Sequence, residues 1–415
     1  MTPERIVVFP GRLLIGDGSP ARAGGALVIE DGRFATVCER VDLGARPEAD
    51  RVIDAPDATA MPGLIDAHVH LAYDGGDEPA ATKARLVQRS YPALALDAAH
   101  HARATLSWGV TTVRDLSAPG GVVIDLRDAV AEGRLPGPRI VACGTGITAT
   151  GGHMDVPWTP DHVRTRDLVA VADGPDAVRR VVREQAKRGA DLIKINLCVG
   201  SRIDPERPWR QELADDEVVA AVDEAHRLER KVAAHTSGGP SVTFAVRSGL
   251  DSVEHGHWLD EACAEAMASG GAAHVPTLLV NERNFEVGRA PERPGASRRS
   301  WLERAREAKW GSVERVHRAG APIVAGTDAG FMVPHGAGSL AREIELLTRC
   351  GLTSLEALRA ATAEAADLLG VDAGRLAPGL AADFLLVDGD PVADLAILQD
   401  RSRFRTFVSG RPADA

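Results

Sequence analysis

The chain lacks any arrangement of cysteines that would predict a disulfide framework or a cysteine-bound metal. Its 415 residues contain five cysteines, an odd number, and no two of them form a CxxC pair. Scattered single thiols are typical of proteins that fold in a reducing compartment. We therefore expect free cysteines.

A surplus of positive charge and a long apolar run are also missing. The net charge is -11 at pH 7, which argues against a nucleic-acid-binding surface. No run of about 18 apolar residues predicts a membrane span, and residues 1–5 lead into only a short apolar stretch, unlike a secretion signal. We expect a cytoplasmic protein without nucleic-acid or membrane partners. Association of identical copies is left open.

The dinucleotide-binding turn Gly-x-Gly-x-x-Gly does not follow the first strand of the middle region, residues 61–373. Strands and helices alternate there, which predicts a parallel sheet. Helical segments include 176–188, 214–229, 260–269 and 301–319. The strand candidates are residues 61–67, 110–116, 139–144, 191–197, 231–236, 252–257, 272–279 and 322–328. Eight such strands predict a (β/α)₈ TIM barrel, and the missing turn disfavours the alternative, an open doubly wound sheet.

Helical periodicity is absent at both chain ends. Short strands are predicted at 6–9, 26–33 and 51–54, and again at 382–390 and 405–410, with a hairpin signal at Asp31-Gly32. Each end alone is too small to bury a core. We therefore predict one small β-sandwich composed of residues 1–60 and 374–415. Two separate β-appendages are the alternative.

Two histidines stand at the end of the first predicted barrel strand. His68 and His70 are two residues apart, so on a strand both side chains point to the same face. Imidazole is the commonest metal ligand in proteins, and the pair could hold one ion. A half-exposed strand that carries two histidines by chance is the simpler explanation of this pair alone.

Further polar side chains end other predicted strands. They are Lys194 in the fourth, His235 in the fifth, His255 in the sixth and Asp328 at the end of the eighth. Active sites of barrels form at the carboxyl ends of the strands, so these side chains are expected to converge. Each has a structural alternative, such as helix capping by Asp328. The whole set is poorly explained by chance.

These motifs resemble those of the amidohydrolase superfamily of metal-dependent hydrolases. Within it, the chain is most similar to the branch that contains imidazolonepropionase-like proteins, Xaa-Pro dipeptidases, related metallocarboxypeptidases and ochratoxin-type amidases. The matching motifs are PGLIDAHVH at 62–70, ARATLSWGVTTVRDL at 102–116, TGGH at 150–153, IKI at 193–195, AAH at 233–235, VEHG at 253–256, GTDAG at 326–330 and GRLAPGLAADF at 374–384.

The resemblance implies a site with two metal ions. A lysine neutralised by burial can react with carbon dioxide to give an anionic carbamate, whose two oxygens can bridge two ions. The resemblance implies this N6-carboxylation at Lys194 and two divalent ions, zinc or manganese. It assigns His68, His70 and Asp328 to one ion and His235 and His255 to the other. A strand lysine that reaches solvent from the barrel rim is the alternative for Lys194.

Such a site would hydrolyse an amide bond. A hydroxide that bridges the ions would attack the carbonyl. Asp328 would act as general base and then as general acid, and His153 would hydrogen-bond the carbonyl oxygen. His257 and Arg202 are candidate substrate contacts, and the segments 158–175 and 281–299 are expected to shape the pocket.

The substrate class is left with alternatives. We favour an N-acyl amino acid or dipeptide of the Xaa-Pro kind. Carboxypeptidase-like members often carry a tyrosine near the strand-five histidine, and here His235 is followed by Thr236 and Ser237, which weakens the dipeptidase assignment. A cyclic amide, imidazolone or lactone is the second hypothesis. A non-catalytic scaffold is the third, and the full ligand set counts against it.

Overall fold

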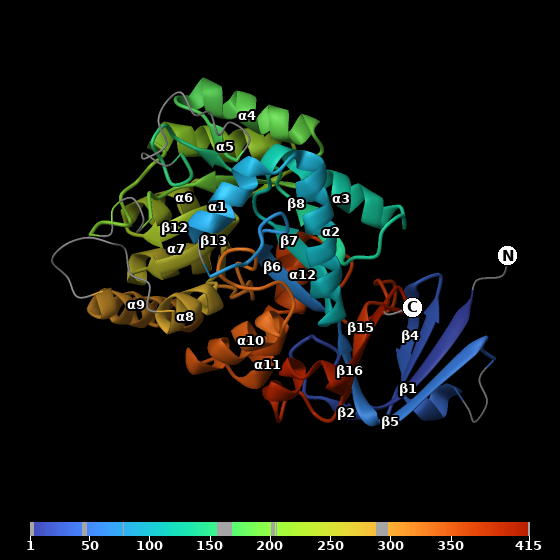
Figure 1. Ribbon diagram of the computed structural model, residues 1–415. Helices are drawn as coiled ribbons and strands as arrows, with labels where there is room; N and C mark the ends of the chain where they lie inside the picture. The colour runs from blue at the N-terminus through green and yellow to red at the C-terminus, as the bar shows by residue number, and fades with distance from the viewer. Residues whose placement is uncertain are drawn as a thin grey trace.

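The computed structural model describes residues 4–43, 48–77, 79–155, 168–200, 204, 206–287 and 298–413. It consists of a mixed α/β part and a β-sheet that projects from one side of it (Figure 1). The five cysteines are free and four of them are buried, as expected from their scattered positions. Among the described residues, no helix is long and apolar enough to cross a membrane.

Both chain ends contribute strands to one eight-stranded sheet. Its order is β17-β16-β15-β5-β1-β3-β4, and β2 pairs with β1. Strand β5 pairs in parallel with β1 and antiparallel with β15, where Met61 lies opposite Leu385. The strands are β1 Arg5–Leu13, β2 Arg22–Ala23, β3 Ala26–Glu30, β4 Arg33–Cys38, β5 Arg51–Pro62, β15 Phe384–Asp388, β16 Phe404–Val408 and β17 Arg411–Pro412.

The strands follow one hydrogen-bonded path, because β5 pairs on both of its edges, and this path curls over on itself, since Phe34 of β4 contacts Phe384 of β15 although three strands lie between them in the order. The predicted hairpin at Asp31-Gly32 is confirmed, since both residues have positive φ and join β3 to β4. The core of the sheet contains Phe384, which stacks on Phe407 with ring centroids 4.5 Å apart and contacts Phe34. Aromatic residues from both chain ends therefore share one core.

The α/β part contains two parallel sheets. The first has the order β6-β7-β8, and the second has the order β10-β9-β11-β12-β13-β14. Their strands are β6 Leu64–Val69, β7 Val110–Asp115, β8 Arg139–Ala142, β9 Ile147–Thr148, β10 Ala170–Val171, β11 Leu192–Asn196, β12 Lys231–Gly238, β13 Ser252–Trp258 and β14 Ala273–Val275. The first seven predicted barrel strands correspond to β6, β7, β8, β11, β12, β13 and β14.

Backbone hydrogen bonds join the two sheets at both edges. On one side, the N–H of Asp191 donates to the carbonyl of Ala142 at 2.8 Å. On the other side, the segment 322–329 lies between β14 and β6, where the N–H of Ala67 donates to the carbonyl of Ala325 at 3.0 Å. The strand ends are thereby brought to one side of the α/β part.

Two predicted strands need correction. Residues 322–328 do not form a continuous strand. Ile323 makes an isolated bridge to β14 and single backbone hydrogen bonds join the segment to β6, because Pro322 has no N–H and the backbone turns at Asp328, whose φ is 61°. The strand predicted over 272–279 ends at Val275. Pro276 and a positive φ at Thr277 stop it there, and α8 begins at the next residue.

Helices flank the parallel sheets, and most present an apolar stripe to them. Helix α4, for example, buries Val178, Val181 and Val182 at helical spacing. Segments predicted as helical at 176–188, 214–229, 260–269 and 301–319 are confirmed as α4, α5, α7 and α9. The helices are α1 Pro79–Gln88, α2 Tyr91–Ser107, α3 Val122–Ala131, α4 Pro175–Lys187, α5 Asp215–Arg227, α6 Pro240–Arg247, α7 Glu261–Gly270, α8 Leu278–Glu286, α9 Arg298–Ala319, α10 Ser339–Arg349, α11 Ser354–Ala360 and α12 Ala363–Leu369.

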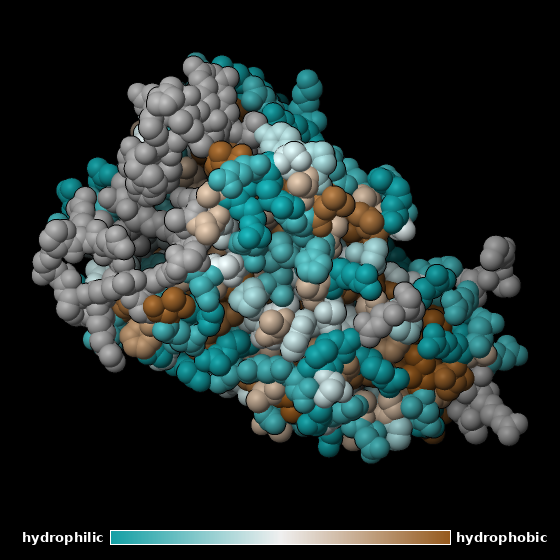
Figure 2. Space-filling model, viewed as in Figure 1, coloured by the Kyte–Doolittle hydropathy of each residue, from teal (hydrophilic) through white to brown (hydrophobic). Residues whose placement is uncertain are grey.

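The surface is mostly hydrophilic on the face shown in Figure 2, with hydrophobic side chains in small separate groups. Large apolar side chains are mainly in the core, and single exposed ones such as Val41 and Leu96 are normal for a folded protein.

Candidate active site and metal centre

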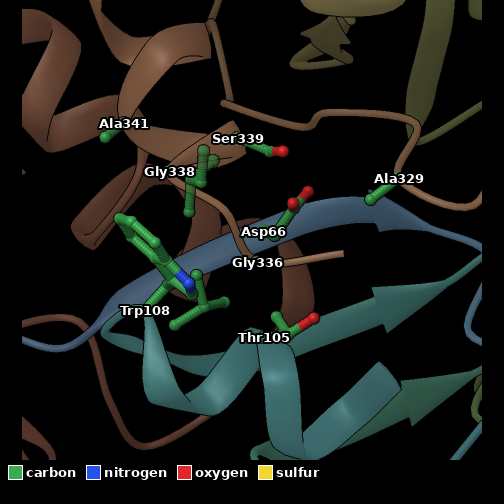
Figure 3. A pocket seen from close by; sticks show the side chains of 10 residues that line it. Asp66, Thr105, Trp108, Ala329, Gly336, Gly338, Ser339 and Ala341 are labelled. Carbon is green, nitrogen blue, oxygen red and sulfur yellow. The ribbon is translucent and has the colours of Figure 1, made fainter. Parts of the chain in front are cut away.

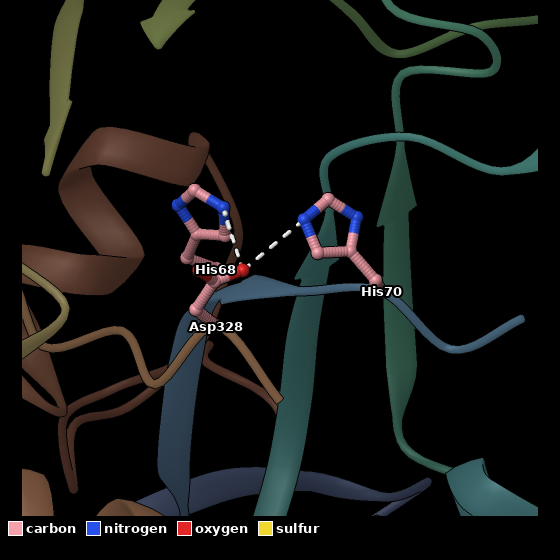
Figure 4. A group of neighbouring side chains, drawn as sticks. All are labelled: His68, His70 and Asp328. Carbon is pink, nitrogen blue, oxygen red and sulfur yellow. Dashed lines mark ion pairs between the residues drawn. The ribbon is translucent and has the colours of Figure 1, made fainter. Parts of the chain in front are cut away.

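Three predicted ligands meet at the carboxyl end of β6. His68 is in β6, His70 follows it, and Asp328 ends the segment that lies beside β6 (Figure 4). One ligand atom from each lies within 4.8 Å of the others. Asp328 Oδ1 is 3.2 Å from Nε2 of His70 and 3.6 Å from Nε2 of His68. Two imidazoles and a carboxylate at this spacing fit a divalent cation.

The turn that carries Asp328 is held against β6. The N–H of Asp328 donates to the carbonyl of His68 at 2.8 Å. The Asp66 carboxylate accepts hydrogen bonds from the backbone N–H of Thr327 at 3.0 Å and from its hydroxyl at 2.7 Å. Burial raises the pKa of Asp66 to about 7, even though these hydrogen bonds lower it. The positive φ of Asp328 is therefore enforced by contacts from β6.

Asp66 also lines a small cavity. Figure 3 shows this cavity between α2 and the start of α10, with Thr105, Trp108 and Ser339 among its lining residues. Asp66 and Thr105 are buried, and both oxygens of the Asp66 carboxylate already accept from Thr327. Asp66 is thus a positioning residue and not a ligand candidate.

The other predicted ligands lie next to this cluster. The ring centroids of His68 and His255 are 4.8 Å apart, and those of His255 and His235 are 4.7 Å apart. Burial, followed by neighbouring positive groups, keeps the pKa of His235 and of His255 well below its usual range. Both rings are therefore neutral, which is the form that binds metals.

Two buried nitrogen atoms in this group have no hydrogen-bond partner among the residues that the structure describes. They are Nε2 of His68 and Nε2 of His235. Leaving a buried nitrogen unpaired is costly, so such atoms require a partner that protein side chains do not supply. A metal ion would satisfy both, so the residues present fit a metal centre.

Lys194 is buried on β11, beside the strand that carries His235. Burial lowers the pKa of its amine to about 8. A sizeable neutral fraction is thus available at physiological pH, which is the form that reacts with carbon dioxide. The alternative of a rim lysine extended into solvent is excluded by its 5% exposure.

The buried ion pair of Glu254 and Arg114 supports His68 on the Nδ1 side of its ring. Glu254 accepts a hydrogen bond from Nδ1 of His68 at 2.8 Å and pairs with Arg114 at 2.7 Å. Burial alone would raise the pKa of Glu254, but Arg114 and His68 outweigh it and hold this pKa well below its usual range. The ionised carboxylate fixes the Nδ1–H tautomer of His68 and leaves Nε2 free for a metal.

We expect Glu254→Gln to lower metal affinity by about 10–100-fold, because the amide supports the His68 tautomer less strongly. Titration of the metal-free protein against a competing chelator measures this. Glu224→Gln is the matched control. Glu224 is also a buried carboxylate, and it pairs with Arg183 at 2.8 Å between α5 and α4, away from the ligand cluster. Equal metal affinity for the two variants would contradict the role of Glu254.

His153 lies over the ligand cluster. Its ring stacks on His235 with centroids 3.8 Å apart, and Nδ1 lies 3.1 Å from the carbonyl of Val199. The half-buried Glu212 carboxylate holds this loop by accepting from the N–H of His153 at 2.7 Å. Burial raises the pKa of Glu212 to about 7. His153 therefore faces the same space as the predicted ligands.

The remaining candidate substrate contacts are His257 and Arg202, and no contact within the described part of the chain joins either of them to the ligand cluster as closely as His153. His257 is on β13 and stacks on Trp258, with ring centroids 5.2 Å apart. Trp258 in turn contacts Trp209. Arg202 lies outside the described residues, as do 158–167 and 288–297 of the two segments expected to shape the pocket. Tyr73 packs against His70, with ring centroids 4.9 Å apart.

Sequence reasoning missed the supporting residues of the site. It assigned no role to Asp66, Arg114, Glu212, Glu254 or Thr277. A charged residue within a buried strand, such as Glu254 directly before His255, is a signal that could have been used. Its partner Arg114 is 140 positions away in the chain, so the ion pair between them could not be predicted from the sequence.

Comparison with known proteins is consistent with this geometry. Residues 59–413 match the amidohydrolase family. Ochratoxinase of Aspergillus niger is 29% identical over 95% of this chain and 83% of its own sequence. Its crystal structure superimposes with a TM-score of 0.88 over 99% of this chain and 96% of that one, at 26% identity.

Two further relatives carry other activities. The crystal structure of a Xaa-Pro dipeptidase with bound methionine in its active site has a TM-score of 0.86, with 28% identity over 99% of each chain. Imidazolonepropionase of Salinispora tropica is 28% identical over 89% of this chain and 87% of its own. Since the family match covers most of the sequence, this chain belongs to the amidohydrolase family and is a hydrolase of carbon–nitrogen bonds.

Proposed function

We propose that this protein hydrolyses the amide bond of an N-acyl amino acid or a dipeptide at a centre of two divalent metal ions. The observation that carries the proposal is the pair of unpartnered nitrogens, Nε2 of His68 and Nε2 of His235, beside the buried Lys194. We further propose that residues 61–373 form a (β/α)₈ barrel around this centre. Residues 1–60 and 374–415 would form the composite β-domain.

The residues divide between two ions. His68, His70 and Asp328 would hold the first, and His235 and His255 the second. Lys194, once carboxylated, would contact both. Zinc is the expected metal because imidazole and carboxylate ligands suit it, and manganese is the alternative. When bound, the two ions supply Lewis-acid polarisation of the carbonyl and acidify a water molecule.

Asp328 would move the proton. Burial alone would raise its pKa, but the hydrogen bond from His70 and the nearby positive groups outweigh this, so its pKa is lowered and the carboxylate is ionised. An ionised carboxylate beside the reacting water can accept its proton and then deliver it to the leaving amine.

His153 would stabilise the oxygen of the scissile carbonyl. The carbonyl of Val199 can only accept, so Nδ1 of His153 carries a proton. Nε2 can then donate to a carbonyl oxygen only while the ring is protonated.

We expect His153→Ala to lower kcat by about 10²–10³-fold, as for a lost oxyanion donor. Steady-state kinetics with the substrate identified below measures this. His257→Ala is the comparison, and it should act mainly on KM because His257 lies farther out on β13. An unchanged kcat in His153→Ala would remove His153 from the chemical step.

The substrate class is supported by two relatives. A Xaa-Pro dipeptidase of the same fold holds methionine in its active site, and ochratoxinase is named for ochratoxin. A cyclic amide of the imidazolone kind, or a lactone, is the second candidate, favoured by the similarity to imidazolonepropionase. A non-catalytic scaffold is disfavoured, because the relatives with a named activity are enzymes.

A substrate screen tests the proposal. The protein is loaded with zinc or manganese and assayed against Xaa-Pro dipeptides, N-acyl amino acids, imidazolones and lactones. We expect turnover of the first two groups and loss of turnover in the metal-free protein. Turnover of only imidazolones or lactones would favour the second candidate. Equal turnover without metal would contradict the proposed centre.

A further inference from the structure

Thr277 is held in a backbone conformation that its side chain disfavours. It stands between β14 and α8, and its φ of 49° lies in the left-handed region, which β-branched residues rarely adopt. Strained residues of this kind persist only where surrounding contacts enforce them, and they gather at functional sites.

Two buried side chains of opposite charge hold Thr277 in place. Glu343 of α10 accepts from the backbone N–H of Leu278 at 2.8 Å and from that of Leu279 at 2.6 Å. Lys309 of α9 donates to the carbonyl of Thr277 at 2.7 Å and to its hydroxyl at 3.2 Å. Both charged side chains are 0% exposed. We call this arrangement the Lys309–Glu343 clamp.

The clamp leaves the Thr277 hydroxyl available. Thr277 is the N-cap residue of α8, a position where a threonine hydroxyl usually accepts from the helix backbone. Here it makes no such bond, because the Glu343 carboxylate accepts from the first two N–H groups of the helix. The hydroxyl oxygen instead lies 2.8 Å from Nδ1 of His255.

The contact between this oxygen and Nδ1 links the hydroxyl to the tautomer of His255, because the hydroxyl can accept from a protonated Nδ1 or donate to an unprotonated one. The Lys309 ammonium donates to one lone pair of the hydroxyl oxygen, and the other can accept from Nδ1–H of His255. A proton on Nδ1 leaves Nε2 of the neutral ring without one. The backbone of His255 is itself left-handed, with φ 65°, and Nε2 of His274 lies 3.2 Å from its carbonyl.

We propose that Lys309 and Glu343 are positioning residues that act through Thr277 on His255, setting its tautomer and directing Nε2 toward the second ion. The metal-binding step rests on the function proposed above. The tautomer does not, because it is a property of the metal-free chain.

Thr277→Val and Thr277→Ser form the central test. Valine keeps the shape and branching of threonine but has no hydroxyl, and serine restores the hydroxyl. We expect Thr277→Val to bind the second ion about 10–100-fold more weakly while it keeps the first, with recovery in Thr277→Ser. Metal titration followed by elemental analysis measures both ions.

Nitrogen-15 NMR of labelled histidine in the metal-free protein gives the second readout. We expect His255 to be an Nδ1–H tautomer in the wild type and in Thr277→Ser, and to lose this preference in Thr277→Val. Thr362→Val is the control, since the Thr362 hydroxyl is buried and donates to Leu358 at 2.7 Å in the connection between α11 and α12. It should match the wild type in both measurements.

The clamp itself is tested with Lys309→Met/Glu343→Gln, which removes both charges and so leaves no unpaired charge buried. We expect it to reproduce the Thr277→Val result. Wild-type affinity for the second ion together with a wild-type tautomer in both variants would overturn the inference. If the wild type binds fewer than two ions, the proposed function fails, and the tautomer measurement still decides the inference.

Discussion

Replacing Asp328 with asparagine should abolish most turnover while leaving the metal in place. Asparagine keeps the shape of the side chain and one coordinating oxygen but removes the basic oxygen that accepts the proton. We expect kcat to fall by at least about 10²–10⁴-fold, the range for lost general acid–base catalysis. KM and metal content should change little. The acidic limb of the pH–rate profile should also change, because Asp328 contributes to it.

Asp191→Asn is the matched control for this measurement. Asp191 precedes β11, at the opposite end of the strand from the site, and its carboxylate accepts from the N–H of Ala142 at 2.9 Å. Its substitution should leave kcat and the pH–rate profile unchanged. If Asp328→Asn stays within a few-fold of the wild type on the true substrate, another group carries the proton and the proposed chemistry is wrong.

Lys194→Ala should lose the second ion and with it nearly all activity. The carbamate contributes the shared ligand, and a metal ion contributes several kcal/mol of transition-state stabilisation. Since each 1.4 kcal/mol is about tenfold in rate, we expect kcat/KM to fall by at least about 10³-fold. A short carboxylate such as acetate should restore part of the activity by replacing the carbamate oxygens.

Mass spectrometry gives an independent readout of Lys194. The wild type should carry the added mass of one carbon dioxide, which acidification removes. Lys231→Ala is the control, because Lys231 begins β12 and donates to the carbonyl of Leu368 at 2.6 Å, away from the site. An unmodified Lys194 beside a single bound ion would contradict the two-metal proposal.

Local patterns were sufficient to predict most of the strands and the positions of the candidate ligands. His68 and His70 could be assigned to one strand face because side chains alternate along a strand. The prediction failed where the pattern was interrupted. The expected eighth strand is reduced to an isolated bridge to β14 and single hydrogen bonds to β6, since Pro322 has no N–H and Asp328 turns the backbone.

The support of the ligands depends on contacts between distant parts of the chain. Glu254 reaches His68 and Arg114 across 186 and 140 positions. Thr277 lies between Lys309 of α9 and Glu343 of α10. Such pairings leave no periodicity in the sequence, because they are made between elements that meet only after folding.

The sequence by itself therefore determined the alternation of strands and helices, the approximate strand ends and the histidine, lysine and aspartate residues at or near those ends. Strand and helix periodicities arise from local backbone geometry, which each short segment carries on its own. Only the tertiary structure decided which nitrogens lack a partner, how far Lys194 is buried and how Thr277 is held. Burial and hydrogen bonding depend on what the rest of the chain packs against each group, and that is a property of the whole fold.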